Sequence, residues 1–307
     1  MSEHSLDTPV ALFIFNRPHL TQKVFNAIRQ AKPSRLLVIA DGPRSDRVSE
    51  AELCIQSRAV IEQVDWQCQI LTNFSETNMG CKRRISSGLN WVFDTVEEAI
   101  ILEDDCLPHP TFFPFCEALL NYYRDDTRIM VISGGNFQFG HKRTNDSYYF
   151  SRYNHCWGWA SWRRAWRYYD VDMSLWSTVK QGSWLHDLLG DDRTVQYWTE
   201  MLEAVSCNRI DTWDYQWTFA CWIQHGLSIL PNVNLVSNIG FGTNATHTTE
   251  INQFSNLVTA AMQFPLKHPA FVIQDVKADN LTHQRIDREN RLAKLNAAIK
   301  HTIKRLA

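Results

Sequence analysis

The 307-residue sequence predicts an α/β fold in which a mostly parallel sheet is covered by helices on both faces. Short apolar runs alternate with helix-length segments through the first 135 residues, as in repeated strand–helix–strand units. Polar or acidic residues follow several of these runs directly, which places them at the carboxyl ends of strands. The hydrophobic content of 44% is enough for a sizeable core.

The expected elements follow in chain order from this alternation. Five short runs rich in apolar side chains are the expected strands, at residues 10–15, 35–40, 68–72, 99–102 and 129–133. Four longer segments have the length and patterning of helices, at residues 19–31, 49–64, 81–93 and 111–124. Parallel strands end at one edge of a sheet, and a nucleotide binds at that edge. The residues expected there are Arg17, Asp41, Asn73 and Asp104.

Three consecutive acids end the fourth of these strands. The apolar run from Ala99 to Leu102 leads directly into Glu103-Asp104-Asp105. Burying uncompensated carboxylates is costly, so such a cluster needs a cation or a strong donor. Mg²⁺ and Mn²⁺ take hard oxygen ligands and often complete their shell with substrate phosphates. The triplet therefore predicts a site for a metal-bound diphosphate, and a solvated acidic turn is the simpler alternative.

Several classes of protein are disfavoured by what the sequence lacks. No Gly-x-Gly-x-x-Gly follows the first strand and no Gly-Lys-Ser/Thr occurs, so neither a dinucleotide fold nor a P-loop is expected. A net charge of -2 gives no reason to expect nucleic-acid binding. The eight cysteines show no zinc-like spacing and are expected to be reduced thiols. Without a signal peptide or an apolar span, the expected location is cytoplasmic.

The second half of the chain is rich in tryptophan. Ten of the twelve tryptophans fall between Trp157 and Trp222, so this half needs either an aromatic core or an aromatic sugar-binding wall. The i, i+4 spacing of Trp162 and Trp166 suits a helix packing face. Trp157 and Trp159, on either side of Gly158, are better placed to line a site.

A second acidic position lies in the run from Asp211 to Trp217. If Asp211 is a helix N-cap, Asp214 lies at the third helical position. Simple capping is the favoured interpretation of Asp211. Asp214 lies between two tryptophans, which suits a general base. Farther on, a loop with two glycines leads to His247, which is either a surface residue or a ligand of the metal or the diphosphate.

The chain is expected to form one continuous domain in two halves, followed by a helix. Residues 1–135 would bind the nucleotide sugar, residues 136–275 would bind the acceptor, and residues 276–307 would form a C-terminal amphipathic helix. Seven Lys/Arg and two acids lie from Leu281 onward. That helix could dock on the domain, form a homodimer, or lie on an anionic membrane surface, and docking is favoured. Its apolar stripe comprises Leu292, Leu295, Ile299, Ile303 and Leu306.

Several of these motifs resemble a known family in their order and spacing. The motifs are Asn16-Arg17, Asp41-Gly42, Asn78-Met79-Gly80-Cys81-Lys82 and, above all, IILEDDCLPHPTFF. They resemble glycosyltransferases of the GT-A fold, most closely the N-acetylglucosaminyltransferase I type and more loosely the family-two enzymes. The resemblance covers residues 8–250 and is strongest to about residue 125. Its specific part is Glu-Asp-Asp-x-x-x-x-Pro-x-Phe-Phe.

The resemblance implies a role for each matching residue on the donor side. Arg17 and Asp41 would contact the uridine end of a UDP-sugar, and Lys82 would lie near the nucleotide or diphosphate. Glu103 and Asp104 would face the ribose and the donor sugar. Asp105 would bind the Mn²⁺ (or Mg²⁺) that bridges the diphosphate.

On the acceptor side, the resemblance leaves the base open. Trp157-Gly158-Trp159 would lie beside the donor and acceptor sugars. The family's Trp-Asp-Asp-Trp segment supplies its base, and the matching run here, Trp213 to Trp217, has a single Asp and a changed spacing. The base is therefore Asp214 or, as runner-up, Asp211. The family's Phe-Gly…Ser-His segment resembles Phe241-Gly242…Thr246-His247, which favours His247 as a metal ligand.

The sequence thus predicts an inverting, metal-dependent glycosyltransferase. It would transfer a sugar, GlcNAc by family expectation, from a UDP-sugar to an oligosaccharide or lipid-linked glycan. One alternative is a sugar-phosphate nucleotidyltransferase, although the loop Asn16 to His19 lacks the glycine- and basic-rich character that holds a triphosphate. The other alternative is a non-catalytic carbohydrate-binding protein, which would explain the tryptophans but not the acidic triplet.

Overall fold

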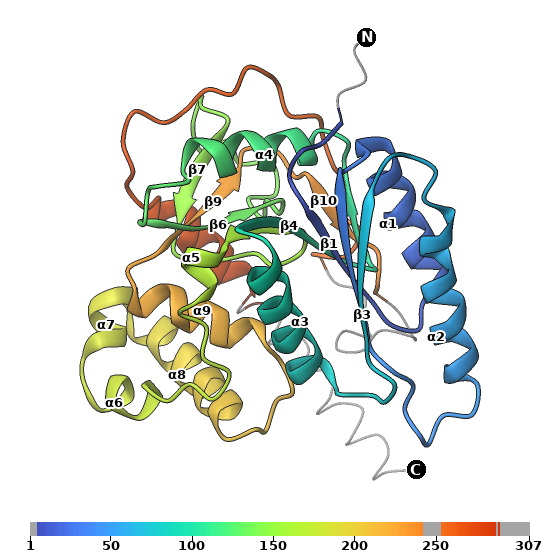
Figure 1. Cartoon of the computed structure of the whole chain (residues 1–307). Coiled ribbons are helices and arrows are strands. Elements are labelled where there is room, and N and C mark those ends of the chain that lie inside the picture. The colour runs from blue at the N-terminus through green and yellow to red at the C-terminus, as the bar shows by residue number, and fades with distance from the viewer. Residues whose placement is uncertain (1–4, 242–252, 287, 289–307) are drawn as a thin grey trace, which may run out of the picture.

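The computed structural model describes residues 5–241, 253–286 and 288. Within these residues one large sheet organises the chain, with the strand order β3-β2-β1-β4-β8-β6-β9-β7 (Figure 1). The strands are β1 Val10–Ile14, β2 Arg35–Ala40, β3 Gln69–Phe74, β4 Glu98–Glu103, β6 Ile129–Ser133, β7 Tyr148–Ser151, β8 Trp159–Trp162 and β9 Leu227–Pro231. Strands β7 and β8 run antiparallel to their neighbours, and the other pairs are parallel.

A second, two-stranded sheet lies beyond the end of β4. Strand β5 Cys106–Pro108 pairs antiparallel with β10 Val236–Asn238. The helices are α1 Pro18–Ala31, α2 Glu50–Ala59, the 3₁₀ helix η1 Val60–Gln63, α3 Cys81–Thr95, α4 Phe112–Tyr122, α5 Arg163–Trp166, α6 Trp176–Gln181, α7 Trp184–Leu189, α8 Asp192–Ser206 and α9 Asp214–Ile223. The predicted α/β fold with a mostly parallel central sheet is confirmed.

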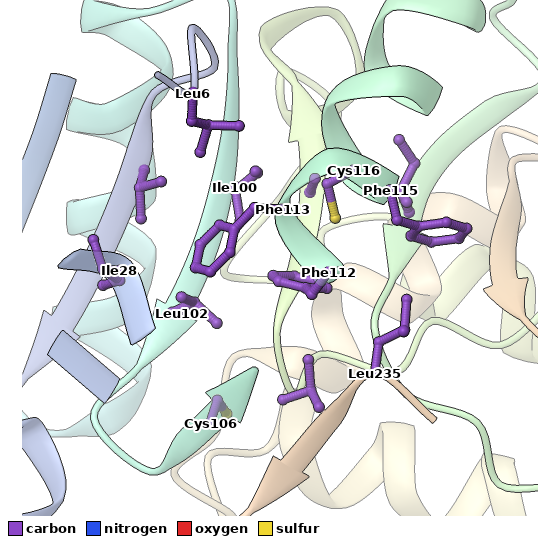
Figure 2. Packing of buried hydrophobic residues seen from close by; sticks show 14 of the residues in the cluster. Leu6, Ile28, Ile100, Leu102, Cys106, Phe112, Phe113, Phe115, Cys116 and Leu235 are labelled. Atoms are coloured by element: carbon purple, nitrogen blue, oxygen red, sulfur yellow. The ribbon is translucent and has the colours of Figure 1, made fainter. Parts of the chain in front are cut away.

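The two faces of the sheet are covered by different helices. Because successive side chains of a strand point to opposite faces, Val10, Leu12 and Ile14 pack with α1, η1 and α4 in one buried cluster. Ala11 and Phe13 pack with α3, α5 and α9 in another. In the first cluster, Phe112 and Phe113 of α4 pack with the β4 side chains (Figure 2). The expectation of helices on both faces is therefore met.

The tryptophan-rich half supplies core as well as surface. Helices α6, α7 and α8 form a helical lobe at the end of the sheet that carries β7 and β9 (Figure 1). Trp176, Trp198 and Trp222 are buried in the core of this lobe together with Tyr153. For most of the tryptophans, the expectation of an aromatic core is therefore the correct one.

The described part of the C-terminal segment docks on the sheet. Residues 276–286 are helical, and the buried Asp279 carboxylate accepts hydrogen bonds from the Ser151 hydroxyl and, at 3.1 Å, from the Arg152 amide. Ala278 packs against β7 and β9. The predicted apolar stripe, from Leu292 onward, lies outside the described residues. Among the described helices, none is long and apolar enough to span a membrane, and all eight cysteines are free thiols.

Gly88 sets the distance between α3 and the sheet. A Cβ built on Gly88 would lie 2.6 Å from Phe13 and 2.8 Å from Ile39. We therefore expect Gly88→Ala to lower the free energy of unfolding by about 1–3 kcal/mol through overpacking, although alanine is the better helix former. Urea denaturation would measure this change. The exposed α3 variant Arg83→Ala is the matched control, and an unchanged or raised midpoint for Gly88→Ala would contradict the prediction.

Candidate functional site

A cleft of about 760 Å³ opens at the carboxyl ends of β1, β2 and β4. The N-terminal part of α3, the loop between α8 and α9 with the start of α9, and residues near Trp157 and Phe241 form its other walls. The cleft brings together residues far apart in the sequence because parallel strands deliver their following loops to one edge. Its predicted members are Arg17, Asp41, Glu103, Asp104, Asp105, Trp157, Asp211 and Asp214.

Arg17 pairs with two of the three acids of the triplet. This residue caps α1, and Pro18 occupies the first helical position, where a missing N–H costs nothing. The Arg17 guanidinium pairs with Asp104, and its Nη1 lies 2.9 Å from Oδ2 of Asp105. The Asp104 side chain is only 2% exposed, so this arginine is the cation that a buried carboxylate requires.

One guanidinium cannot balance three carboxylates, and the pKa values show the imbalance. Desolvation by burial, then the like charges of Asp105 and Asp104, raise the pKa of Glu103 to about 8. Asp214 adds to this rise from the opposite wall of the cleft. Burial also raises the pKa of Asp104 to about 6, against the attraction of Arg17. Further positive charge beside this acidic triplet, the acidic corner of the cleft, would therefore be favourable.

The side of the cleft at the end of β2 is built around Asp41. Its carboxylate accepts hydrogen bonds from the Gly42 and Met79 amides, both at 2.9 Å, and from the Asn78 side chain at 3.0 Å. Burial raises the pKa of Asp41 in spite of these bonds. Both carboxylate oxygens are engaged by the chain itself, so Asp41 orders the loop before α3 as well as facing the cleft.

Asp214 stands on the opposite wall as the first residue of α9. Its Oδ1 accepts a hydrogen bond from the Thr212 hydroxyl. Trp213, directly before it, is 4% exposed and stacks on Trp159 with ring centroids 5.7 Å apart. The Asp214 carboxylate is therefore oriented by the Thr212 hydroxyl, and the backbone before it is fixed by the buried Trp213 ring.

Asp211 was expected to cap the helix that follows it, but it does not. The N-cap of α9 is Trp213. Instead the Asp211 carboxylate accepts hydrogen bonds from the amides of Cys81, at 3.1 Å, and Lys82, at 3.2 Å. Asp211 thus caps α3, about 130 residues away in the sequence.

The structure also corrects the expectations for Lys82, Trp159 and Gly158. Lys82 Nζ donates to Asn208 at 2.8 Å and is not among the residues that line the cleft. Trp159 is 1% exposed, because its place on β8 turns the ring into the core. Gly158 packs against the sheet, where a Cβ would lie 2.7 Å from Val236. Trp157 does line the cleft, with its ring 5.7 Å from that of Phe241.

The donor set at the triplet suits a metal ion that is completed by its substrate. No group of three or more described His, Cys, Asp or Glu side chains could hold a metal by itself. Asp105 offers a carboxylate at the strand end with its side chain 14% exposed. One or two carboxylates with substrate phosphates form a common Mg²⁺ or Mn²⁺ site. The expected ligand His247 lies outside the described residues.

Several cleft residues were not predicted as site residues. Arg44 follows the Asp41-Gly42-Pro43 turn, bonds Glu50 and lies over the Phe15 ring at 5.6 Å. Its place just after a strand end was an available signal. Arg84 also lines the cleft, one helical turn after Gly80, and donates to Asn73. Thr212 and Tyr215 flank Asp214, and nothing in their spacing distinguished them from core or surface residues.

Comparisons with known proteins identify no family. No protein-family model matches the sequence, and no curated protein matches it. A UDP-glucose pyrophosphorylase complexed with UDP-glucose matches with 10% identity and a TM-score of 0.25, over 43% of this chain and 64% of that chain. The match thus spans less than two thirds of the pyrophosphorylase.

A second solved structure is similar at the same level. The inositol-1-phosphate CTP transferase from T. maritima matches with 7% identity and a TM-score of 0.29, over 53% of this chain and 74% of that chain. Neither structure is an N-acetylglucosaminyltransferase, so the comparisons do not narrow the resemblance to that type.

The charge imbalance at the triplet predicts a variant more stable than the wild type. Glu103→Gln keeps the shape of the side chain and removes the charge, so we expect the free energy of unfolding to rise by about 1–2 kcal/mol near pH 8. Because the native pKa of Glu103 is raised to about 8, the native state keeps a proton that the unfolded chain loses above its ordinary pKa. The wild type therefore loses stability as the pH rises from about 4.5 to 8, and the advantage of the variant grows over that range.

Urea denaturation at several pH values measures this difference. Glu62→Gln, an exposed residue with the same charge change, is the control. A Glu103→Gln variant that is less stable than the wild type at pH 8 would show that the carboxylate is compensated within the folded chain.

Proposed function

We propose that this chain is a metal-dependent glycosyltransferase. The proposed reaction moves a sugar from a UDP-sugar to a carbohydrate acceptor with inversion, as in polysaccharide biosynthesis. The observation that carries the proposal is the pairing of two acidic elements across one cleft. An undercompensated triplet lies at the strand ends, and an oriented carboxylate, Asp214, stands on the facing wall. The first element suits a metal-bound diphosphate and the second suits a general base.

The triplet corner would receive the diphosphate. Asp105 would ligate Mn²⁺ or Mg²⁺ together with the phosphate oxygens. The bound metal would supply the positive charge that stabilises the departing nucleoside diphosphate. Arg17 was expected at the uridine end of the donor, but its guanidinium lies beside Asp104 and Asp105 at this corner, so in this proposal it donates to the phosphates instead. Glu103 and Asp104 would face the ribose and the donor sugar.

The facing wall would activate the acceptor. Asp214 would take the proton from an acceptor hydroxyl as that oxygen attacks the anomeric carbon. The Thr212 hydroxyl occupies Oδ1 of Asp214, which leaves Oδ2 to accept this proton. Trp157 and Phe241 line the same cleft, and their rings exclude water that would otherwise hydrolyse the donor. They also offer apolar faces to the sugar rings.

A sugar-phosphate nucleotidyltransferase is the second candidate. The two solved structures described above bear names of that kind, a pyrophosphorylase and a CTP transferase, and the first holds UDP-glucose. The same acidic corner would then bind the metal of a nucleoside triphosphate. Both candidate reactions use a nucleotide, a sugar and a divalent ion. Glycosyl transfer breaks the bond between the anomeric carbon and the diphosphate, whereas nucleotidyl transfer breaks a phosphorus–oxygen bond of the triphosphate.

Two incubations distinguish these candidates. A glycosyltransferase releases UDP from a UDP-sugar when Mn²⁺ and an acceptor are present, whereas a nucleotidyltransferase releases pyrophosphate from UTP and a sugar 1-phosphate. A screen of UDP- and GDP-sugars identifies the donor. If neither product forms and UDP with Mn²⁺ gives no thermal shift, the non-catalytic carbohydrate-binding alternative is favoured.

Separate variants test the metal ligand and the base. We expect Asp105→Ala to lower metal-dependent turnover by about 10²-fold or more, because it removes the carboxylate that holds the ion. We expect Asp214→Asn to bind UDP and Mn²⁺ normally and to lose about 10²- to 10⁴-fold in transfer. Calorimetric titration measures donor binding, and UDP release measures transfer.

The exposed variant Asp125→Asn controls for the loss of one acidic charge and should match the wild type in both assays. A fully active Asp214→Asn protein would remove Asp214 as the base. Metal-dependent turnover that survives in Asp105→Ala would move the metal site elsewhere.

A further inference from the structure

The N-terminus of α3 cannot cap itself. Its N-cap is Gly80, no side chain of the helix caps the first turn, and that turn holds no acidic residue. Gly80 adopts φ +78°, and a Cβ there would lie 3.1 Å from Oδ2 of Asp211. A glycine thus suits both the backbone conformation and the close approach of the distant carboxylate.

The α8–α9 loop supplies the missing cap at two points. Asp211 accepts from the first two amides of α3, and Asn208 of the same loop accepts from Lys82 Nζ. Asn208 itself has a left-handed backbone, φ 54°, which turns the chain away from α8. We call these three contacts between the loop and the first turn of α3 the latch.

Asp211, which makes two of the three latch contacts, lies three residues before Asp214. Between them, Trp213 is buried in the core, and Thr212 donates to the Asp214 carboxylate. The start of α9 is therefore fixed from two directions, by the aromatic core that buries Trp213 and by the latch to the first turn of α3. Without the latch, the loop would keep its backbone hydrogen bonds to α8, such as that from the Arg209 amide to the Ala204 carbonyl, and Trp213 in the core, but would lose its tie to α3.

We propose that Asp211 is a positioning residue, not the base, and that the latch holds the Asp214 carboxylate at its working place in the cleft. This inference rests on the proposed function in so far as Asp214 is the base. The geometry favours this assignment because both oxygens of Asp211 accept hydrogen bonds from main-chain amides. The Thr212 hydroxyl, in contrast, donates to Oδ1 of Asp214 only.

Two substitutions separate positioning from proton transfer. Asparagine is as good a helix cap as aspartate but is no base. We therefore expect Asp211→Asn to retain kcat within about threefold, whereas Asp211→Ala loses about 10- to 100-fold in kcat through misplacement of Asp214. Neither variant should change the Kd for UDP with Mn²⁺ more than about twofold, because the latch carries no proposed donor ligand.

Amide hydrogen exchange rates test whether the latch is formed, and they require no enzymatic turnover. In Asp211→Ala, the amides of Cys81 and Lys82 should exchange about fivefold faster or more, since a helix cap is lost. The Trp217 amide, which bonds the Trp213 carbonyl, reports on the start of α9 and should also exchange faster. Asp94→Ala, an exposed substitution near the other end of α3, is the control and should change none of these values.

Each outcome decides the inference. If Asp211→Asn loses as much transfer as Asp214→Asn, Asp211 is the base and the inference is overturned. It is also overturned if exchange in Asp211→Ala stays at the wild-type rate, or if kcat is unchanged while exchange rises. A wild type that transfers no sugar refutes the proposed function, and exchange at Trp217 then decides whether the latch fixes the start of α9.

Discussion

The ion pairs of Arg17 with Asp104 and Asp105 are the interaction on which the rest of the site depends. They allow a buried strand to end in three carboxylates, and the described ion pairs of the triplet involve this arginine alone. Because one cation offsets two of the acids, the corner stays electrostatically incomplete. Such incompleteness costs stability, and it suits the divalent ion that we propose for this corner, since functional sites often trade stability for binding.

Local patterns were sufficient to predict five of the eight strands of the large sheet, β1, β2, β3, β4 and β6, and the acidic triplet at the end of β4, whereas β7, β8 and β9 were not predicted. Val10 to Ile14 and Ile100 to Leu102 are apolar on both faces, as strands covered on both sides must be. The rule that parallel strands end at one edge then placed Arg17, Asp41 and the triplet together. These predictions required only short-range sequence patterns and one topological rule.

The sequence could not supply partners that arise from tertiary contacts. Lys82 and Asp211 are separated by 129 residues, and no sequence pattern indicates that they meet where α3 contacts the α8–α9 loop. Trp159 was expected at the sugar site because it lies beside Gly158. Its burial depends on β8 entering the sheet antiparallel between β4 and β6, and no pattern in residues 156–170 indicates that place.

The position of β8 also constrains how the molecule can be made. Its residues arrive from the second half of the chain, yet they pair with β4 from the first half and separate it from β6. Until the ribosome has released residues 159–162, β4 presents an open edge with unpaired backbone groups, the kind of edge that invites aggregation. The first half therefore cannot complete the large sheet by itself, because one strand of that sheet comes from residues 159–162.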